Sequence, residues 1–203
     1  MLTLRVRDDL ELKLLEEGDA GRLFAVTNDN RSYLREWLPW VDPTKSVEDT
    51  RNFIRTVLRQ FADNNGFSAG IWYRSELAGT IGHHKVDWLN RATMIGYWLA
   101  EPLQGRGLIT DCCRTLVDHA FHQWRLNRVE IRCGTGNRKS RAIPERLGFR
   151  HEGTLRQAQW VNDRFVDLEV YGMLAAEWFG MRPGTLRHYD ARCVRETRGH
   201  TAK

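Results

Sequence analysis

The chain has 203 residues, of which 41% are hydrophobic and 28% charged, a balance that predicts one folded core and excludes a disordered protein. Residues 1–15 mix Arg5, Arg7 and Glu11 with apolar side chains, which excludes a signal peptide or a spanning helix and predicts a cytoplasmic protein away from membranes. The formal net charge of +5 lies mostly beyond residue 180, where six basic residues accompany two acidic ones. We therefore expect one domain over residues 1–180, a basic tail over 181–203, and no direct binding of nucleic acid.

Helices are predicted for the first part of the chain. Apolar spacing between Asp19 and Trp40, broken near Asn28, predicts two short helices. Ser46-Val-Glu-Asp49 has the spacing of a capping box, and the apolar residues that follow it predict a third helix up to Asn64 and Asn65.

Strands are predicted next. Residues 67–73 and 77–86 flank a turn-like Arg74-Ser75-Glu76 and predict a hairpin, and residues 93–99 predict another strand. After Gly107, apolar residues recur every four positions and predict a core-facing helix: Leu108, Cys112, Leu116, Ala120 and Trp124.

The last third alternates strand and helix signals. Residues 129–133 predict a strand, 140–147 a helix that ends at Gly148, and 154–161 with 165–174 a second hairpin around Asn162-Asp163. Because a strand–helix–strand unit from Thr93 to Ile131 places its strands parallel, the sheet is predicted to be mixed.

The cysteines and the adjacent histidines are interpreted as structural. Cys112, Cys113, Cys133 and Cys193 lack the C-x-x-C spacing of redox or metal sites and are expected to be buried and reduced. His83 and His84 face opposite sides of any strand, so they cannot easily share a metal. No metal is predicted, and each histidine is given a structural or solvent-exposed role.

The segment with the clearest chemical meaning joins the strand at 93–99 to the following helix. Gln104-Gly105-Arg106-Gly107 places two glycines around an arginine immediately before a helix start. Glycines permit backbone angles that bring successive N–H groups onto an anion at the positive end of a helix. A diphosphate fits this description.

At these residues the chain resembles the GNAT superfamily of N-acetyltransferases, whose coenzyme A loop reads Gln/Arg-x-x-Gly-x-Gly/Ala. Gln104 to Leu108 matches this loop, whereas Ile109 departs from its last position. The resemblance extends through Asn127-Arg128, the segment 137–149 and Leu34 to Trp40, and is greatest to the ribosomal-protein N-terminal acetyltransferases of the RimJ/RimL type. It implies an α/β (α+β) GNAT fold with a central mixed, mostly antiparallel sheet of six to seven strands, flanked by helices and splayed at the acetyl-coenzyme A site.

The resemblance implies acetyl-coenzyme A as co-substrate. The pantetheine arm would lie along residues 97–99, where an N–H of Tyr97 or Trp98 would polarise the thioester carbonyl and Leu99 would pair with the arm. Asn137 and Ser140 would contact the cofactor as well. The phosphates would be held by the loop and the first helical turn: Gln104, Gly105, Arg106, Gly107, Leu108, Ile109 and Thr110.

The proton-transfer groups are inferred from the same resemblance. Pro144 occupies the position of the usual family tyrosine and cannot donate a proton, so Ser140 is the predicted general acid, with a helix N-cap as its alternative role. Gln159 stands where some relatives have a carboxylate, and an amide can orient a water but not accept a proton. A protein α-amine, with a pKa near 8, needs less help from a base than a lysine-like amine.

Trp37, Trp40 and Trp160 are predicted to line the acceptor groove, with core packing as the alternative use of tryptophan. The predicted acceptor is the N-terminal α-amine of a protein, such as a ribosomal protein. Two alternatives stay open: acetylation of a small amine such as a polyamine or an aminoglycoside, and a non-catalytic module that binds acyl-coenzyme A. Whether the chain forms a homodimer is also left open.

Overall fold

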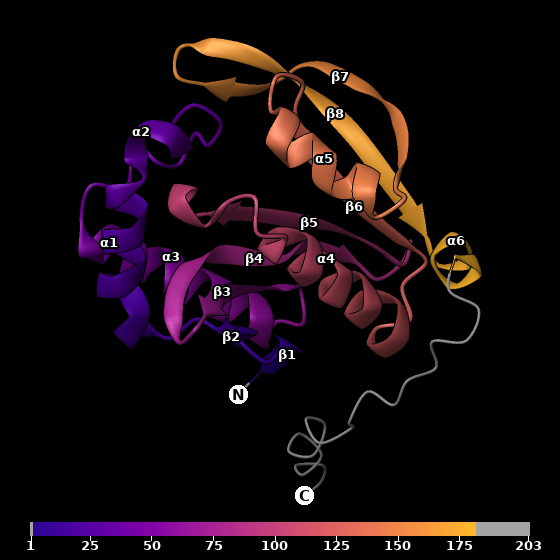
Figure 1. Ribbon diagram of the computed structural model, residues 1–203, viewed down its shortest axis with the longest axis horizontal. Coiled ribbons are helices and arrows are strands. Elements are labelled where there is room, and N and C mark those ends of the chain that lie inside the picture. The colour runs from indigo at the N-terminus through magenta and orange to yellow at the C-terminus, as the bar shows by residue number, and fades with distance from the viewer. Residues whose placement is uncertain (1, 182–203) are drawn as a thin grey trace, which may run out of the picture.

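The computed structural model describes residues 2–181, so residues 182–203 of the predicted basic tail, Cys193 among them, lie outside the described residues. One eight-stranded sheet runs through the molecule in the order β1-β2-β3-β4-β5-β6-β8-β7. Helices α4 and α5 lie on the face of the sheet that is turned to the viewer in Figure 1, whereas α1 and α2 lie at one side. The predicted helix-flanked α/β architecture is confirmed.

The sheet begins with an N-terminal hairpin that the sequence interpretation did not assign. β1 (Thr3–Arg7) pairs with β2 (Leu10–Leu14), and β2 pairs with β3 (Phe67–Tyr73), all antiparallel. The side chains of β2 alternate between buried and half-buried, because its leucines face the core. This hairpin brings the number of strands to eight instead of the six to seven expected.

The three N-terminal helices agree with the sequence pattern. α1 (Ala20–Asp29) and α2 (Arg31–Leu34) are the two short helices, and α3 (Val47–Ala62) follows the predicted capping box. In that box the Ser46 hydroxyl accepts a hydrogen bond from the Asp49 N–H at 3.2 Å, and an Asp49 oxygen accepts from the Ser46 N–H at 2.9 Å. Residues of these helices pack with Trp72, Leu77 and Trp98 in a core cluster of their own.

The central strands form the predicted hairpin and crossover. β3 and β4 (Glu76–Asp87) are antiparallel, as are β4 and β5 (Ala92–Leu99). β6 (Arg128–Gly134) returns after α4 and pairs parallel to β5. The sheet is therefore mixed and mostly antiparallel, as expected.

Helix α4 (Leu108–Asp118) continues into a π-helical turn, His119–Gln123. Apolar residues spaced by exactly four positions drift away from one face of a helix with 3.6 residues per turn. The wider π turn, in which the Trp124 N–H donates to the His119 carbonyl at 3.3 Å, keeps Ala120 and Trp124 on the core side. Cys112 and Cys113 are both fully buried because α4 is covered almost all round.

The remaining elements complete the sheet. α5 (Arg138–Arg146) leads to the hairpin of β7 (Arg150–Val161) and β8 (Arg164–Leu174), and β8 pairs with β6. A short last helix, α6 (Ala175–Gly180), was not anticipated; it buries Trp178, which is 1% exposed, near Phe121.

Candidate active site

The two parallel strands separate halfway along β5. Their pairing runs from Ala92 opposite Arg128 to Ile95 opposite Ile131 and then stops, although β5 continues to Leu99. From that point β6 pairs only with β8. A cleft of about 740 Å³ opens here between α2, α4, α5 and the end of β5. This opening is the predicted splay.

Main-chain groups of β5 face this gap at alternate residues. The Ala100 N–H donates to the Ala78 carbonyl of β4 at 2.8 Å. Successive residues of a strand direct their N–H and C=O groups to opposite sides. Those of Trp98 therefore also point toward β4, whereas those of Tyr97 and Leu99 point into the gap. Of the two N–H groups proposed to polarise a carbonyl, that of Tyr97 has the required direction.

The glycine loop forms one end of the cleft. Gly105 and Gly107 have φ angles of +75° and +76°, a left-handed conformation that other residues adopt only with strain. A Cβ added to either glycine would meet no atom within 4 Å, so their Cα atoms border open space. Gly107 caps α4, and the N–H groups of the first helical turn, from Leu108 on, have no acceptor within the helix. The loop therefore fits an anionic group.

Two cations of α5 face the same end of the cleft, and the sequence interpretation missed both. The Lys139 ammonium donates to the Gln104 amide oxygen at 2.7 Å, and an Arg146 nitrogen lies 3.5 Å from the Thr110 hydroxyl oxygen. Lys139, Ile143 and Arg146 all line the cleft, a spacing that marks one face of a helix. These positive charges add to the anion-binding character of the loop.

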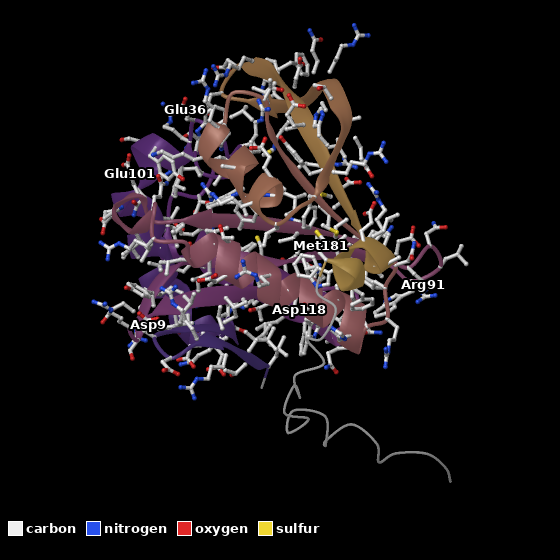
Figure 2. The ribbon with its side chains drawn as sticks, turned by 45° about the vertical axis from the view of Figure 1, so that its right-hand side comes forward. Asp9, Glu36, Arg91, Glu101, Asp118 and Met181 are labelled. Carbon is white, nitrogen blue, oxygen red and sulfur yellow. The ribbon has the colours of Figure 1, made fainter. Side chains whose placement is uncertain are left out.

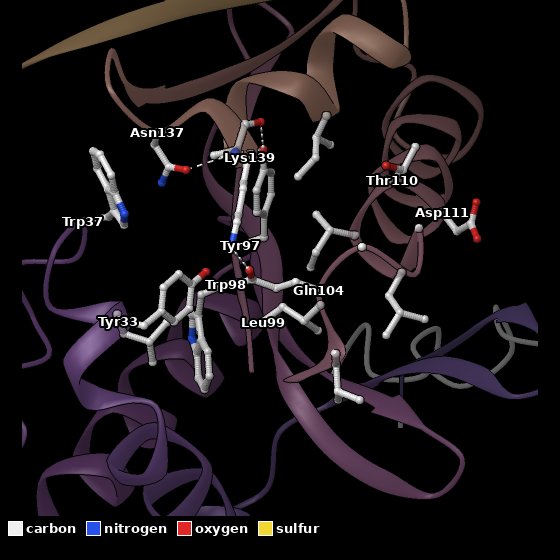
Figure 3. A pocket seen from close by; sticks show the side chains of 18 of the residues that line it. Tyr33, Trp37, Tyr97, Trp98, Leu99, Gln104, Thr110, Asp111, Asn137 and Lys139 are labelled. Carbon is white, nitrogen blue, oxygen red and sulfur yellow. Dashed lines mark hydrogen bonds between the residues drawn. The ribbon is translucent and has the colours of Figure 1, made fainter. Parts of the chain in front are cut away.

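A pair of hydroxyl groups lies deeper in the cleft (Figure 3). The Ser140 hydroxyl donates to the Tyr97 phenol oxygen at 3.2 Å, and the Tyr97 hydroxyl is 3.1 Å from the Ser140 carbonyl oxygen. Burial raises the pKa of Tyr97 well above its ordinary value, so the phenol stays protonated. Burial also raises the pKa of the nearby Cys133 thiol to about 11, which leaves it a poor nucleophile at neutral pH.

Asn137, not Ser140, is the N-cap of α5. Its side-chain oxygen accepts a hydrogen bond from the Ser140 N–H at 3.0 Å. The alternative role that the sequence left open for Ser140 thus belongs to Asn137, and the Ser140 hydroxyl is free to contact Tyr97. Both residues line the cleft.

The opposite wall of the cleft is assembled from distant segments. Trp37, which follows α2, lies against the loop after β6, because a Cβ on Gly134 or on Gly136 would come within 3.2 Å of its ring. The Asn162 amide, at the tip of the β7–β8 hairpin, donates to the Arg35 carbonyl. The hairpin tip therefore reaches back to the α2 region, as Figure 1 shows. Tyr33, which the sequence interpretation missed, also lines this wall.

Acidic side chains lie near Tyr33. Burial raises the pKa of its phenol, and the negative charges of Glu101 and Glu36 add to the effect. Figure 2 shows Glu36 and Glu101 on the same side of the molecule, away from Arg91. The cleft thus has a cationic end at α5 and carboxylates beside α2.

Four predicted site residues lie outside the lining of the cleft: Arg106, Gln159, Trp40 and Trp160. Arg106 is exposed on the loop, 3.4 Å from the Pro102 carbonyl oxygen. Trp40 packs on Trp98, and Trp160, 51% exposed, packs on Phe165. The other predicted residues line the cleft together, and Ile109, 8% exposed, turns its side chain mostly into the core.

Cysteines and metal ligands add nothing to this site. Cys112, Cys113 and Cys133 are free and buried. Residues 2–181 hold no group of three or more side chains suited to a metal ion. Within the same residues, no helix is long and apolar enough to cross a membrane.

Comparison with known proteins assigns the family. The model of the acetyltransferase (GNAT) domain matches residues 9–150. A Bacillus subtilis (strain 168) protein named "Putative ribosomal N-acetyltransferase YdaF" is 41% identical over 181 residues, which are 89% of this chain and 99% of the relative. The ribosomal-protein-serine acetyltransferase of Escherichia coli (strain K12) is 32% identical over 174 residues, 85% of this chain and 96% of the relative.

Solved structures agree. RimL, a ribosomal L7/L12 α-N-protein acetyltransferase in complex with coenzyme A, superposes with a TM-score of 0.83 at 26% identity, over 87% of this chain and 99% of that one. The chain belongs to the GNAT acetyltransferase family and is an N-acetyltransferase. The predicted family, fold and enzyme class are confirmed.

Proposed function

We propose that this N-acetyltransferase acetylates the N-terminal α-amine of a protein, a ribosomal protein in particular, in the cytoplasm, and that residues 1–180 form the acetyltransferase domain. The observation that carries the proposal is the gap between β5 and β6, which holds main-chain groups between a phosphate-binding loop on one face of the sheet and an aromatic wall beside α2. Two relatives that span nearly the whole domain are named for ribosomal acetylation, which supports this acceptor.

Acetyl-coenzyme A is the co-substrate. Its diphosphate suits the left-handed glycines and the free N–H groups at the start of α4, with Lys139 and Arg146 opposite. Its pantetheine arm would pair with the main chain of Leu99 in the gap. The Tyr97 N–H would then donate to the thioester carbonyl and stabilise the oxyanion that develops on it.

The departing thiolate needs a proton, and the Tyr97–Ser140 hydroxyl pair is placed to supply it. Ser140 lies in the first turn of α5 and Tyr97 belongs to β5, so the pair connects the helix to the strand across the gap. A raised pKa keeps the Tyr97 phenol protonated. Because the Ser140 hydroxyl donates to the phenol oxygen, a proton can pass from the serine to the tyrosine as the tyrosine gives one up. Gln159 lies on β7 and is assigned no proton transfer, because an amide cannot accept a proton.

An α-amine acceptor suits this modest machinery. Its pKa near 8 leaves a useful neutral fraction at physiological pH, whereas a lysine-like amine near 10.4 is almost wholly protonated. Trp37 and Tyr33 line the cleft with aromatic side chains, and the carboxylates near Tyr33 attract the cationic form of an amine.

The test is thiol release from acetyl-coenzyme A by purified protein with matched acceptors. The panel contains short peptides that begin with serine or alanine, the same peptides blocked at the N-terminus but carrying a lysine, spermidine, and an aminoglycoside. We expect turnover with the free peptides only, and mass spectrometry should place the acetyl group on the α-amine.

The other outcomes separate the alternatives. Turnover confined to spermidine or the aminoglycoside contradicts the protein acceptor and supports a small-amine enzyme. Calorimetric binding of acetyl-coenzyme A without turnover of any amine supports a non-catalytic module.

A further inference from the structure

His84 lies on β4 beside the point where β5 leaves β6. Gly96 of β5 pairs with Gly82 of β4, and it immediately follows the last paired residue, Ile95. A Cβ added to Gly96 would collide with Nε2 of His84 and would come 2.9 Å from its Cδ2 and 3.0 Å from its Cε1. The imidazole therefore rests directly on the Cα of Gly96, in space that only a glycine leaves open.

This imidazole is on the face of the sheet opposite the phosphate-binding loop. Side chains alternate faces along β5. Tyr97 points to Ser140 of α5, so Gly96 and Trp98 face the other way, and Trp98 indeed packs in the cluster of α1 and α3. The His84 imidazole thus lies on this opposite face, which is the acceptor side. It lies against Gly96, the residue before Tyr97, and the Tyr97 N–H is the one proposed to face the thioester carbonyl.

The two adjacent histidines differ in exposure and therefore in use. His83 is 1% exposed and packs among Phe67, His119 and Trp124. His84 reaches solvent, yet the surrounding protein displaces enough water to lower its pKa below the ordinary value. A lowered pKa keeps the imidazole neutral at physiological pH, with a lone pair available for a proton.

The charges near His84 leave this state undisturbed. From β6, Glu130 and Arg132 face the same side, but they are ion-paired with each other, and Glu130 also pairs with Arg128 at 2.8 Å. Lys85 follows on β4, and the uncharged Gln60 amide of α3 lies 3.4 Å from the His83 carbonyl oxygen. Burial shifts the pKa of His84, and among residues 2–181 no carboxylate forms an ion pair with the imidazole.

We infer that the His84 imidazole accepts the proton that the acceptor amine loses during acetyl transfer, and that Gly96 exists as glycine to seat it. The inference rests on the proposed function. The amine nitrogen forms a bond to the acetyl carbon while the carbon–sulfur bond breaks. Its proton passes to His84, directly or through one water, and the thiolate takes a proton from the Tyr97–Ser140 pair. The imidazolium then releases its proton to solvent, and the hydroxyl pair regains one.

The first test is the pH dependence of kcat/KM for His84→Gln, with acetyl-coenzyme A and a short serine-starting peptide. As the pH is lowered, kcat/KM of the wild-type protein falls once near pH 8, where the peptide amine becomes protonated, and again below the pKa of His84, where the imidazole becomes protonated. Glutamine fills a similar space but cannot accept a proton, so we expect a loss of about 100-fold or more at pH 7 and the disappearance of the second fall. The dissociation constant for coenzyme A and the Tm should stay unchanged.

A second variant tests whether the glycine at position 96 is needed to leave space for the imidazole. In Gly96→Ala the new Cβ displaces the imidazole, which is the movable end of a side chain, so the fold should persist while the rate falls as in His84→Gln. The double variant should be no slower than either single one, because both changes remove the same group. His122→Gln is the matched control: His122 packs on Phe179, away from the cleft, and its loss should leave kcat/KM unchanged.

The outcomes are distinct. If wild-type protein acetylates the peptide and His84→Gln stays within about threefold of it with the same pH profile, the inference is wrong and the proposed function stands. Additive losses in the double variant would also overturn it, since Gly96 would then act independently. If the wild-type protein acetylates no peptide, the proposed function and the inference both fail.

Discussion

The two sides of the cleft are built in different ways. The donor side consists of one continuous segment, from Gln104 to Thr110, that presents main-chain N–H groups and is completed by α5. The acceptor side combines segments that lie far apart in the sequence: β4, the α2 region, whose Trp37 packs against Gly134 and Gly136, and the β7–β8 hairpin, whose Asn162 contacts Arg35. Every residue type except proline supplies a main-chain N–H group, so the donor side constrains backbone conformation, whereas the acceptor side constrains side-chain identity and packing.

This difference predicts how each side responds to substitution. On the donor side, only changes that alter backbone conformation or add charge should matter greatly. On the acceptor side, adding a single methyl group at a glycine far in the sequence from the catalytic residues should alter catalysis, because contacts between distant segments position the side chains of this wall.

The largest effect is expected on the donor side. Gly107→Glu places a carboxylate at the start of α4, where repulsion from a diphosphate should weaken coenzyme A binding by more than about 100-fold. The fold should survive, since the new side chain enters open space, although the left-handed φ costs about 1–3 kcal/mol. Calorimetry with coenzyme A measures the affinity, and cooperative thermal melting reports the fold.

Gly107→Gln carries the same backbone strain without the charge and isolates the electrostatic part. Gly21→Glu is the control for added charge, because Gly21 lies on α1 and is also unobstructed. An unchanged affinity in Gly107→Glu would show that the loop does not bind the phosphates.

The donor side could be predicted from the sequence because its chemistry is local. The spacing of Gly105 and Gly107 before an amphipathic helix is visible in a single segment. The fold was readable for a similar reason, since helices and strands follow from local periodicity. The N-terminal hairpin was not predicted, although Leu10, Leu12 and Leu14 alternate with polar residues as expected of a half-buried strand.

The acceptor side could not be predicted in this way. His84 of β4 contacts Gly96 of β5, and Trp37 contacts Gly134, nearly a hundred residues further along the chain. No local sequence pattern indicates either contact. The caps of α5 show a subtler limit: Asn137 and Ser140 are both residue types that cap helices, and only the fold decides that Asn137 does so.

The second prediction separates acid effects on the fold from acid effects on the acceptor side. Burial lowers the pKa of His119 from 6.5 to about 4. Above pH 6.5 this histidine is neutral in both states, so it adds no pH dependence. Between pH 6.5 and 4 the unfolded chain binds a proton at this histidine that the folded protein does not, so the contribution of His119 to the free energy of unfolding should fall by about 3 kcal/mol as pH decreases and then level off.

Denaturant unfolding at several pH values measures this slope, and His119→Phe should reduce it while keeping the aromatic packing on Phe67 and Trp124. Burial also lowers the pKa of His83, which accounts for part of the slope that remains. A slope identical to that of the wild-type protein would mean that His119 titrates normally. His84→Gln should also reduce this slope, because the pKa of His84 is lowered in the folded protein, but unlike His119→Phe it should change the pH profile of activity as well.

The third prediction concerns the Tyr97–Ser140 hydroxyl pair, which connects β5 to α5 on the donor side. Ser140→Ala removes the hydroxyl that meets Tyr97, so kcat should fall by about 10- to 100-fold while the affinity for acetyl-coenzyme A changes little. Asn137→Ala is the contrasting variant, because loss of the N-cap should lower stability by about 1 kcal/mol. A loss of stability in Ser140→Ala without a change in rate would assign that serine to structure.

The smallest effect tests the acceptor wall itself. In Gly134→Ala the new Cβ would lie 3.2 Å from Cε3 of Trp37, closer than ordinary van der Waals contact, so the indole must shift by a few tenths of an ångström. A displaced wall should raise the KM for a serine-starting peptide by about two- to fivefold and leave coenzyme A binding unchanged. Gly18→Ala, where a Cβ meets no neighbour, is the matched control. Equal KM values for these two variants would remove Trp37 from the acceptor site and leave it a packing residue between α2 and the β6–α5 loop.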